Sequence, residues 1–271
     1  MRALDPILVA PLFQPLNDEL VALLRGLRPE EWNAPTVCAG WSVKDVAAHL
    51  LDTALRRLSA HRDHHQKPAD VNGGLVQLVN FMNREWVSTA RRLSPEVLTD
   101  MLDRYGRQMA DFFATVDPHA QAKWAVSWAG EERSPMWFDV ARELTERWHH
   151  QQQIRDAVGR PPLYESRFFI PVIDTFMRAL PFTYRAVDAP AGTSLAFEIS
   201  DVGSWFLHRG SAWTLSRQGS GTPAATVSMS GDTAWRLFTK GISREAARTR
   251  VEIKGPRQYG EPVLSTLAII G

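Results

Sequence analysis

The chain has 271 residues, of which 44% are hydrophobic and 23% charged, and its formal net charge is +1. This composition is typical of a globular protein, and the length is sufficient for two domains of common size. Basic and acidic residues are interspersed, and no basic run is interleaved with aromatic residues, which excludes a general attraction to nucleic acid. No apolar stretch approaches the roughly 18 residues of a membrane span, and the N-terminus lacks a signal-peptide pattern. We therefore expect a cytoplasmic protein with no membrane partner.

Apolar residues at helical spacing predict that roughly the first 160 residues form helices separated by turns. Ser94 and Pro95 mark one helix start, as a cap followed by proline at the first helical position. Gly159 and Pro161 stop the last helix of this part. The expected helices span residues 12–27, 42–64, 75–93, 94–116 and 134–159.

From about Val187 the apolar pattern changes to a period of two, which predicts short strands joined by turns. The expected strands are 193–200, 204–209, 213–217, 225–229 and 251–254. A helix is expected at 233–240, and another from Pro262. The apolar residues 167–185 predict a helix that links two domains.

These patterns predict an α+β fold made of two domains. A helical domain is expected over residues 1–164, followed by a smaller α+β domain over residues 165–271. A helical bundle can bring ligands from different helices together in its core.

His49 lies in a helix whose start is marked by Ser42. Asp45 follows three positions later, which completes a capping box in outline, with Asp in the place of Glu. The apolar positions Val43 and Val46 face a core, and His49 lies on or beside the same stripe. A single histidine on such a face is more often a core residue bonded to a carbonyl than a metal ligand.

Glu146 and His150 stand at i and i+4 on a second helix, so their side chains leave the same face. By themselves they are most simply a solvated surface pair. Together with His49 they could supply three ligands of a metal site and leave a fourth position for water or substrate. His149 could replace His150, although it lies about 100 degrees away around the helix.

Cys38 is the single cysteine, which rules out an internal disulfide and fits a reducing compartment. It precedes a helix N-terminus, where a thiolate nucleophile would be stabilised. The simpler interpretation, which we prefer, is a small apolar residue that packs the turn.

Two segments resemble one family. Residues 38–50 are similar to the C-x-G-W-S/T-V-x-D-V-x-x-H-L signature of the DinB-like superfamily, in its mycothiol-dependent maleylpyruvate isomerase branch. Residues 146–161 are similar to that branch's E-L-W-V-H-G-Q-D-I-R-x-A-L-G-R-P segment. The residues that fall in step are Trp148, His150, Gln152, Ile154, Arg155, Ala157, Gly159, Arg160 and Pro161.

The resemblance implies a DinB-like four-helix bundle followed by a sterol-carrier-protein-like domain, to which S-G-D-T-A-W-R-L contributes a short match. It also implies that His49, Glu146 and His150 bind a divalent metal. Zinc is the metal expected from the His and Glu ligands, and nickel is the alternative. Mycothiol or another low-molecular-weight thiol would be the second cofactor.

Two further site residues depend on this resemblance. Gln153 stands where the family usually has Asp, so it can orient a ligand but cannot act as a base. Arg236, in the second domain, is the cation expected for a charged substrate, ahead of Arg142. The alternative for either arginine is a surface charge.

The sequence thus predicts an enzyme, a thiol-dependent isomerase or transferase acting on a small electrophilic molecule, as a monomer or homodimer. Two alternatives remain: a non-catalytic stress protein that binds metal and a small ligand, and a metal-dependent hydrolase. The cluster of His61, His64 and His65 is expected to be a solvated helix end rather than a metal site. Several of the ten tryptophans could line a pocket around the metal, although core packing explains most of them. The candidates for such a pocket are Trp86, Trp128, Trp137 and Trp148.

Overall fold

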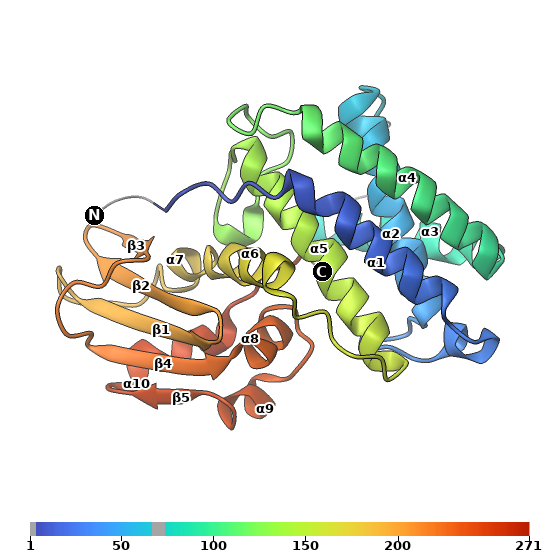
Figure 1. The fold of residues 1–271 in the computed structure, drawn as a ribbon. Helices are drawn as coiled ribbons and strands as arrows, with labels where there is room; N and C mark the ends of the chain where they lie inside the picture. Colours follow the sequence, from blue (N-terminus) through green and yellow to red (C-terminus); the bar gives the residue numbers. More distant parts are fainter. Residues whose placement is uncertain (1–3, 67–73, 271) are drawn as a thin grey trace. The chain divides into compact units, whose positions relative to one another are not determined.

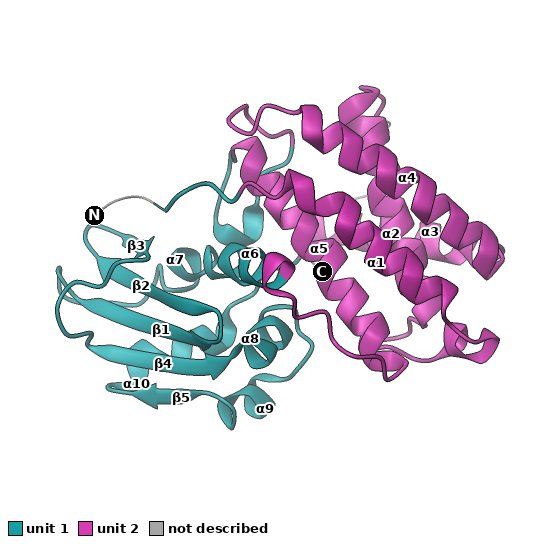
Figure 2. Ribbon diagram, in the orientation of Figure 1, with its two compact units in different colours: residues 1–7, 124–134, 169–269 teal, residues 8–123, 135–168, 270–271 magenta. Residues whose placement is uncertain are grey.

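A computed structural model describes residues 4–66 and 74–270 (Figure 1). The described residues form two compact units, which Figure 2 shows in different colours. The helical unit contains residues 8–123 and 135–168, and the sheet unit contains residues 4–7, 124–134 and 169–269. The predicted domain boundary at residue 164 stays a prediction.

In the described part of the helical unit, five α-helices form the framework. They are α1 (Phe13–Arg25), α2 (Val43–Arg57), α3 (Leu75–Ala90), α4 (Pro95–Thr115) and α5 (Met136–Ala157). Helices α1, α2, α4 and α5 pack against one another as a four-helix bundle, and α3 packs along α2. Ser94 caps α4 by accepting a hydrogen bond from the Val97 N–H at 3.2 Å, as its sequence predicted.

Apolar side chains from several helices fill the centre of this bundle. Val46, Leu50, Leu98 and Leu102 are inaccessible to solvent, and Ile154 of α5 joins the same cluster. Burial of these apolar side chains makes the main favourable contribution to the free energy that holds the helices together. Val46 lies in the core, as the helical periodicity predicted.

The sheet unit contains one five-stranded mixed sheet. Its strands are β1 (Ser194–Ser200), β2 (Gly203–Arg209), β3 (Trp213–Ser216), β4 (Ala225–Ser230) and β5 (Glu252–Lys254). The order is β3-β2-β1-β4-β5, with β1 parallel to β4 and every other pair antiparallel. Phe197 pairs with Trp205 across β1 and β2, and both side chains are fully buried.

Helices accompany this sheet before and after it in the chain. They are α6 (Ser166–Met177), α7 (Leu180–Thr183), α8 (Gly231–Phe238), α9 (Arg244–Arg248) and α10 (Arg257–Gly260). The predicted change from helices to strands after Val187 is confirmed, and the fold is α+β. Among the described residues, no helix combines the length and the apolar character that crossing a membrane requires.

Two local predictions were wrong. The helix expected from Pro262 is only a 3-10 turn over Glu261–Ser265, because the chain becomes extended at Thr266. His61 is not solvated but 9% exposed, whereas His64 and His65 are exposed. The chain widens there into a π-helical turn, Leu58–Arg62, which keeps the His61 ring inside the bundle beside Arg57.

Candidate metal centre

The position of His49 is set by the first turn of α2. Ser42 Oγ accepts a hydrogen bond from the Asp45 N–H at 3.3 Å, and the Asp45 carboxylate accepts one from the Ser42 N–H at 3.0 Å. This is the predicted capping box, and it fixes where the helix begins. His49 is consequently directed into the unit and is only 7% exposed.

The preceding loop places Trp41 against His49. Gly40 has a φ of +76°, a left-handed conformation that glycine adopts without steric cost. The Trp41 N–H donates to the Cys38 carbonyl at 3.0 Å, and the ring centroids of Trp41 and His49 are 5.2 Å apart. Trp41 therefore covers one side of the imidazole.

Glu146 and His150 lie one turn apart on α5, and their side chains meet. His150 Nε2 is 3.4 Å from Glu146 Oε2, and the two side chains are 9% and 17% exposed. The two side chains are thus largely buried, unlike the solvated surface pair that their spacing alone suggested.

His49, Glu146 and His150 come together between α2 and α5. One nitrogen or oxygen atom from each lies within 4.8 Å of the others, and the two imidazole centroids are 4.8 Å apart. Nδ1 of His49 is buried and has no hydrogen-bond partner among the described residues. A buried polar atom without a partner is costly unless a ligand satisfies it. The group can therefore hold a metal ion, for which two imidazoles and one carboxylate suit zinc.

The electrostatics of the group give two of its three residues the protonation state that metal binding needs. Burial opposes ionisation of Glu146, but His149 and the hydrogen bond from His150 hold the pKa of its carboxyl well below the ordinary value. Burial, aided by the charge of His150, holds the pKa of His49 well below its ordinary value. Glu146 is thus an anion and His49 a neutral imidazole near pH 7, as ligands must be. Burial opposes the charge of His150, but hydrogen bonds with Cys38 and Glu146 raise the pKa of its ring to about 10, so His150 must release a proton when a metal binds.

Gln153 and Cys38 meet beside His150. Gln153 Oε1 accepts hydrogen bonds from His150 Nδ1 at 2.7 Å and from the Cys38 thiol at 3.2 Å. With Nδ1 as the donor, Nε2 of His150 is left for a metal. Gln153 thus contacts the ring that it was predicted to orient. The hydrogen bond from Cys38 has no local signal in the sequence, because it joins residues 115 positions apart.

His149 faces a different partner from His150. Its Nδ1 donates to the Thr145 carbonyl at 2.8 Å, and it is not one of the three grouped residues. Burial, with the charge of His150 as the next cause, lowers the pKa of His149 to about 3. His150, and not His149, is therefore the histidine of α5 that lies close to His49 and Glu146.

The two predicted arginines are engaged in ion pairs. Arg236 of α8 belongs to the sheet unit, where it pairs with Asp232 at 2.9 Å and lies over the Trp235 ring. Its role toward a substrate stays a prediction. Arg142 is 14% exposed and pairs with Asp139 at 2.7 Å, so it is not a surface charge.

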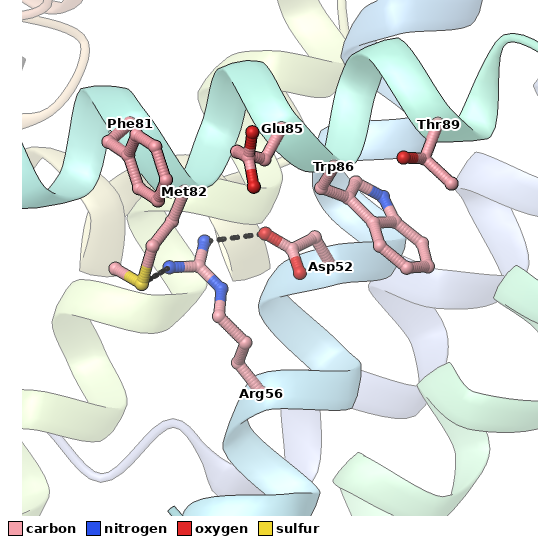
Figure 3. Close-up of a pocket in the computed structure, with 7 residues that line it drawn as sticks. All are labelled: Asp52, Arg56, Phe81, Met82, Glu85, Trp86 and Thr89. Carbon is pink, nitrogen blue, oxygen red and sulfur yellow. Dashed lines mark hydrogen bonds and ion pairs between the residues drawn. The ribbon is translucent and has the colours of Figure 1, made fainter. Parts of the chain in front are cut away.

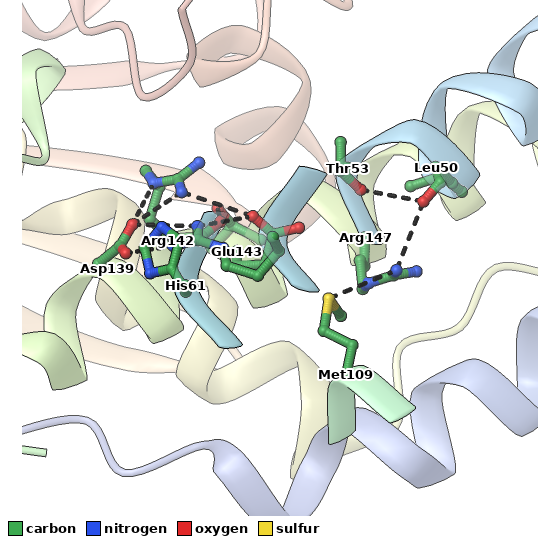
Figure 4. A network of polar contacts seen from close by, with 10 residues as sticks. Leu50, Thr53, His61, Met109, Asp139, Arg142, Glu143 and Arg147 are labelled. Carbon is green, nitrogen blue, oxygen red and sulfur yellow. Dashed lines mark hydrogen bonds and ion pairs between the residues drawn. The ribbon is translucent and has the colours of Figure 1, made fainter. Parts of the chain in front are cut away.

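Asp139, Arg142 and Glu143 of α5 belong to a buried ion network (Figure 4). Arg57 of α2 is inaccessible to solvent and pairs with Asp139 and, at 3.0 Å, with Glu143. Asp139 and Glu143 stand seven and three residues before Glu146, on the same face of the helix. The network therefore ties α2 to α5 near the residues that contribute the candidate ligands.

The fold and the site define an α+β protein with a helical bundle whose buried His49, Glu146 and His150 could hold a metal. Residues 13–155 match the family model of the mycothiol maleylpyruvate isomerase N-terminal domain. The chain belongs to this family, because the match covers more than half of its residues.

Two curated relatives and two solved structures are similar to the chain. The relatives are uncharacterized proteins from two strains of Mycobacterium tuberculosis, each 28% identical over 143 residues. The chain spans about half the length of these relatives, 53%. The structures are mycothiol-dependent maleylpyruvate isomerase and a mutant of it, with TM-scores of 0.52 and 0.51 at 13% identity. The match covers 85% of this chain and 86% of theirs, which shows a common fold.

Proposed function

We propose that the chain is a metal-dependent enzyme that uses a low-molecular-weight thiol to isomerise a small electrophilic substrate or to transfer sulfur to it. The observation that carries the proposal is the group of His49, Glu146 and His150, with the orphaned Nδ1 of His49. Family membership and the fold shared with mycothiol-dependent maleylpyruvate isomerase support the use of mycothiol.

The metal and the thiol together would supply a thiolate nucleophile near neutral pH, which both isomerisation of an activated double bond and S-transfer require. His49, Glu146 and His150 would hold the metal, with zinc expected and nickel as the alternative. Gln153 keeps the His150 ring in place and carries no charge, so it acts by positioning rather than as a base.

One tryptophan and two arginines have further proposed roles. Trp41 covers the His49 ring and limits the access of water on that side. Arg236 is proposed to bind an anionic group of the substrate, and Arg142 is the weaker candidate because Asp139 and Glu143 already engage it. The protein would act in the cytoplasm on a small molecule.

The experiment is an absorption titration of the cobalt-loaded chain with mycothiol, glutathione, bacillithiol and cysteine in turn. The proposal predicts a sulfur-to-cobalt charge-transfer band with one of these thiols, and no such band in His49→Ala. A cobalt-loaded protein that gives no band with any thiol would contradict thiol use. Hydrolysis of a small substrate by that same protein would favour the hydrolase instead.

A further inference from the structure

The helical unit has a pocket of about 320 Å³ between α2 and α3 (Figure 3). Arg56 and Asp52 meet inside it at 2.9 Å, so their charges offset each other. The described residues that line this pocket include no serine, cysteine or histidine. A pair of side chains better suited to covalent chemistry lies in the sheet unit.

His208 lies near the end of β2, and the loop between β3 and β4 runs past it. In the sheet, β2 and β1 separate the two strands that this loop connects. Residues 217–224 therefore pass both strands, and the Ala224 N–H donates to the Ser194 carbonyl of β1 at 2.7 Å. His208 is only 4% exposed. The loop thus brings its own polar groups to a buried imidazole.

Close contacts hold the loop in place beside β2. A Cβ on Gly219 would lie 2.9 Å from Phe206 Cε1, so the loop can rest on this ring only because the residue is glycine. Phe206 and His208 are two positions apart on β2 and share a face, with ring centroids 6.4 Å apart. Ser216 Oγ accepts from the Gln218 N–H at 2.9 Å and donates to the Gln218 carbonyl at 3.2 Å. The loop is therefore fixed without a ligand.

Two hydrogen bonds set the tautomer of His208. The Gln218 carbonyl lies 2.9 Å from His208 Nε2. Because a carbonyl can only accept, Nε2 carries the proton of the neutral ring and Nδ1 keeps its lone pair. Ser220 Oγ lies 3.1 Å from Nδ1, so its hydroxyl donates to this nitrogen. The hydroxyl proton thus faces a base that a third group orients, which is the arrangement of an activated serine nucleophile.

The oxygen of this serine is open to an incoming molecule. Ser220 is exposed, whereas the imidazole behind it is buried. An electrophile can therefore approach from solvent while the base stays on the protein side. Gln218 and Gly219 are exposed as well, so the site suits a small molecule rather than one that needs a deep pocket.

We propose that Ser220 is a nucleophile that takes an acyl group from a small activated ester, with His208 as its general base. Ser220 Oγ bonds to the carbonyl carbon while its proton passes to His208 Nδ1. The bond from that carbon to the alcohol oxygen then breaks, and the imidazolium returns the proton to the leaving alcohol. The Gln218 carbonyl accepts from Nε2–H throughout and stabilises the imidazolium. Water, deprotonated by the same ring, releases the carboxylic acid and restores the serine.

The test labels the zinc-loaded full chain with a fluorophosphonate probe and locates the adduct by mass spectrometry. The probe forms a phosphorus–oxygen bond with an activated serine and releases fluoride, while the serine proton goes to the base. We expect an adduct at Ser220 that forms at least about 100-fold faster than at Ser211, an exposed serine between β2 and β3. Because both serines belong to one protein, this comparison does not depend on whether a variant folds.

Variants address the two roles separately. Ser220→Ala should lose the fast adduct, and Ser211→Ala should keep it. His208→Gln keeps a donor for the Gln218 carbonyl but removes the base, so labelling of Ser220 should slow by about 100-fold or more. His65→Gln changes an exposed histidine and should leave the rate as it is. With p-nitrophenyl acetate in place of the probe, the acetyl group should be found on Ser220.

Three results would overturn the proposal. They are an adduct that is absent from Ser220, equal rates at Ser220 and Ser211, and an unchanged rate in a folded His208→Gln protein. Water bound at a metal would leave no adduct on the chain, so these outcomes are independent of the proposed function.

Discussion

Gln153 Oε1 accepts a hydrogen bond from His150 Nδ1 at 2.7 Å, and the two residues are three positions apart on α5. This bond fixes the tautomer and the rotation of the His150 ring and directs Nε2 toward Glu146. Because the acceptor is an amide, it orients the ring without adding a charge to the site. Ring orientation and local charge can therefore be tested separately at this one position.

Gln153→Leu should weaken zinc binding by roughly 10- to 100-fold, because the His150 ring loses the group that orients it. Gln153→Glu keeps an acceptor and should bind zinc at least as tightly as the wild-type chain. Competition with a chromophoric chelator measures both affinities. Equal affinity of Gln153→Leu and the wild-type chain would show that the ring is held by other contacts.

His150→Ala should abolish stoichiometric zinc, because two remaining ligands bind the metal weakly. His149→Ala is the matched control, since that ring donates to the Thr145 carbonyl and is not grouped with His49 and Glu146. Metal analysis after dialysis distinguishes the two proteins. Full zinc occupancy in His150→Ala, or loss of zinc in His149→Ala, would assign the ligand to His149 instead of His150.

Local signals in the sequence were sufficient to place the candidate ligands on their helices. Ser42 and Asp45 mark the start of α2, and the i and i+4 spacing puts Glu146 and His150 on one face of α5. That these two helices bring the three side chains together could be expected only from the family resemblance. Periodicity says which face of a helix is buried, but not which helix covers it.

Other features of the site had no local signal. Cys38 meets Gln153 through a loop whose path depends on the left-handed Gly40. Arg57 and Asp139 carried no sequence signal of burial, because charged residues are rarely buried unless they are paired. Their pairing joins residues 82 positions apart, which a single sequence does not reveal.

Arg57→Met should lower the free energy of unfolding by up to about 3–5 kcal/mol, because the buried carboxylates of Asp139 and Glu143 lose Arg57 and keep Arg142 as a partner. Arg107→Met is the control. Arg107 is about half exposed and pairs with Asp18 and Asp103 on the surface, so its loss should cost less than about 1 kcal/mol. Urea unfolding of both proteins measures the difference. Comparable losses would mean that the buried network adds nothing beyond a surface pair.

His61 makes the stability of the metal-free chain depend on pH. Burial, together with the charge of Arg57, lowers the pKa of His61 to about 4 from an unfolded value of about 6.5. The neutral ring is thus favoured by folding, so its contribution is fully present above pH 6.5 and is lost as the pH falls toward 4. The loss is at most about 3 kcal/mol.

His61→Gln keeps an acceptor for Arg57 without a group that titrates in this range, so unfolding should depend less on pH between 7 and 4. His65→Gln changes an exposed histidine and should leave the pH dependence as it is. The measurement is urea unfolding in the presence of a chelator at several pH values. Identical profiles for the two variants would show that His61 does not titrate as its surroundings imply.

Cys38 is the only cysteine of the chain, and its thiol donates to Gln153 Oε1 at 3.2 Å. Under the proposed function the nucleophile is an external thiol, so Cys38→Ser should retain most thiol-dependent activity. The serine hydroxyl can make the same hydrogen bond to Gln153, which keeps the support of His150 intact. A nucleophilic Cys38 would instead lose several orders of magnitude in kcat, because a hydroxyl is a far poorer nucleophile near neutral pH. Turnover measured with and without added mycothiol separates the two roles. Activity that needs Cys38 but no added thiol would assign the chemistry to the protein's own sulfur.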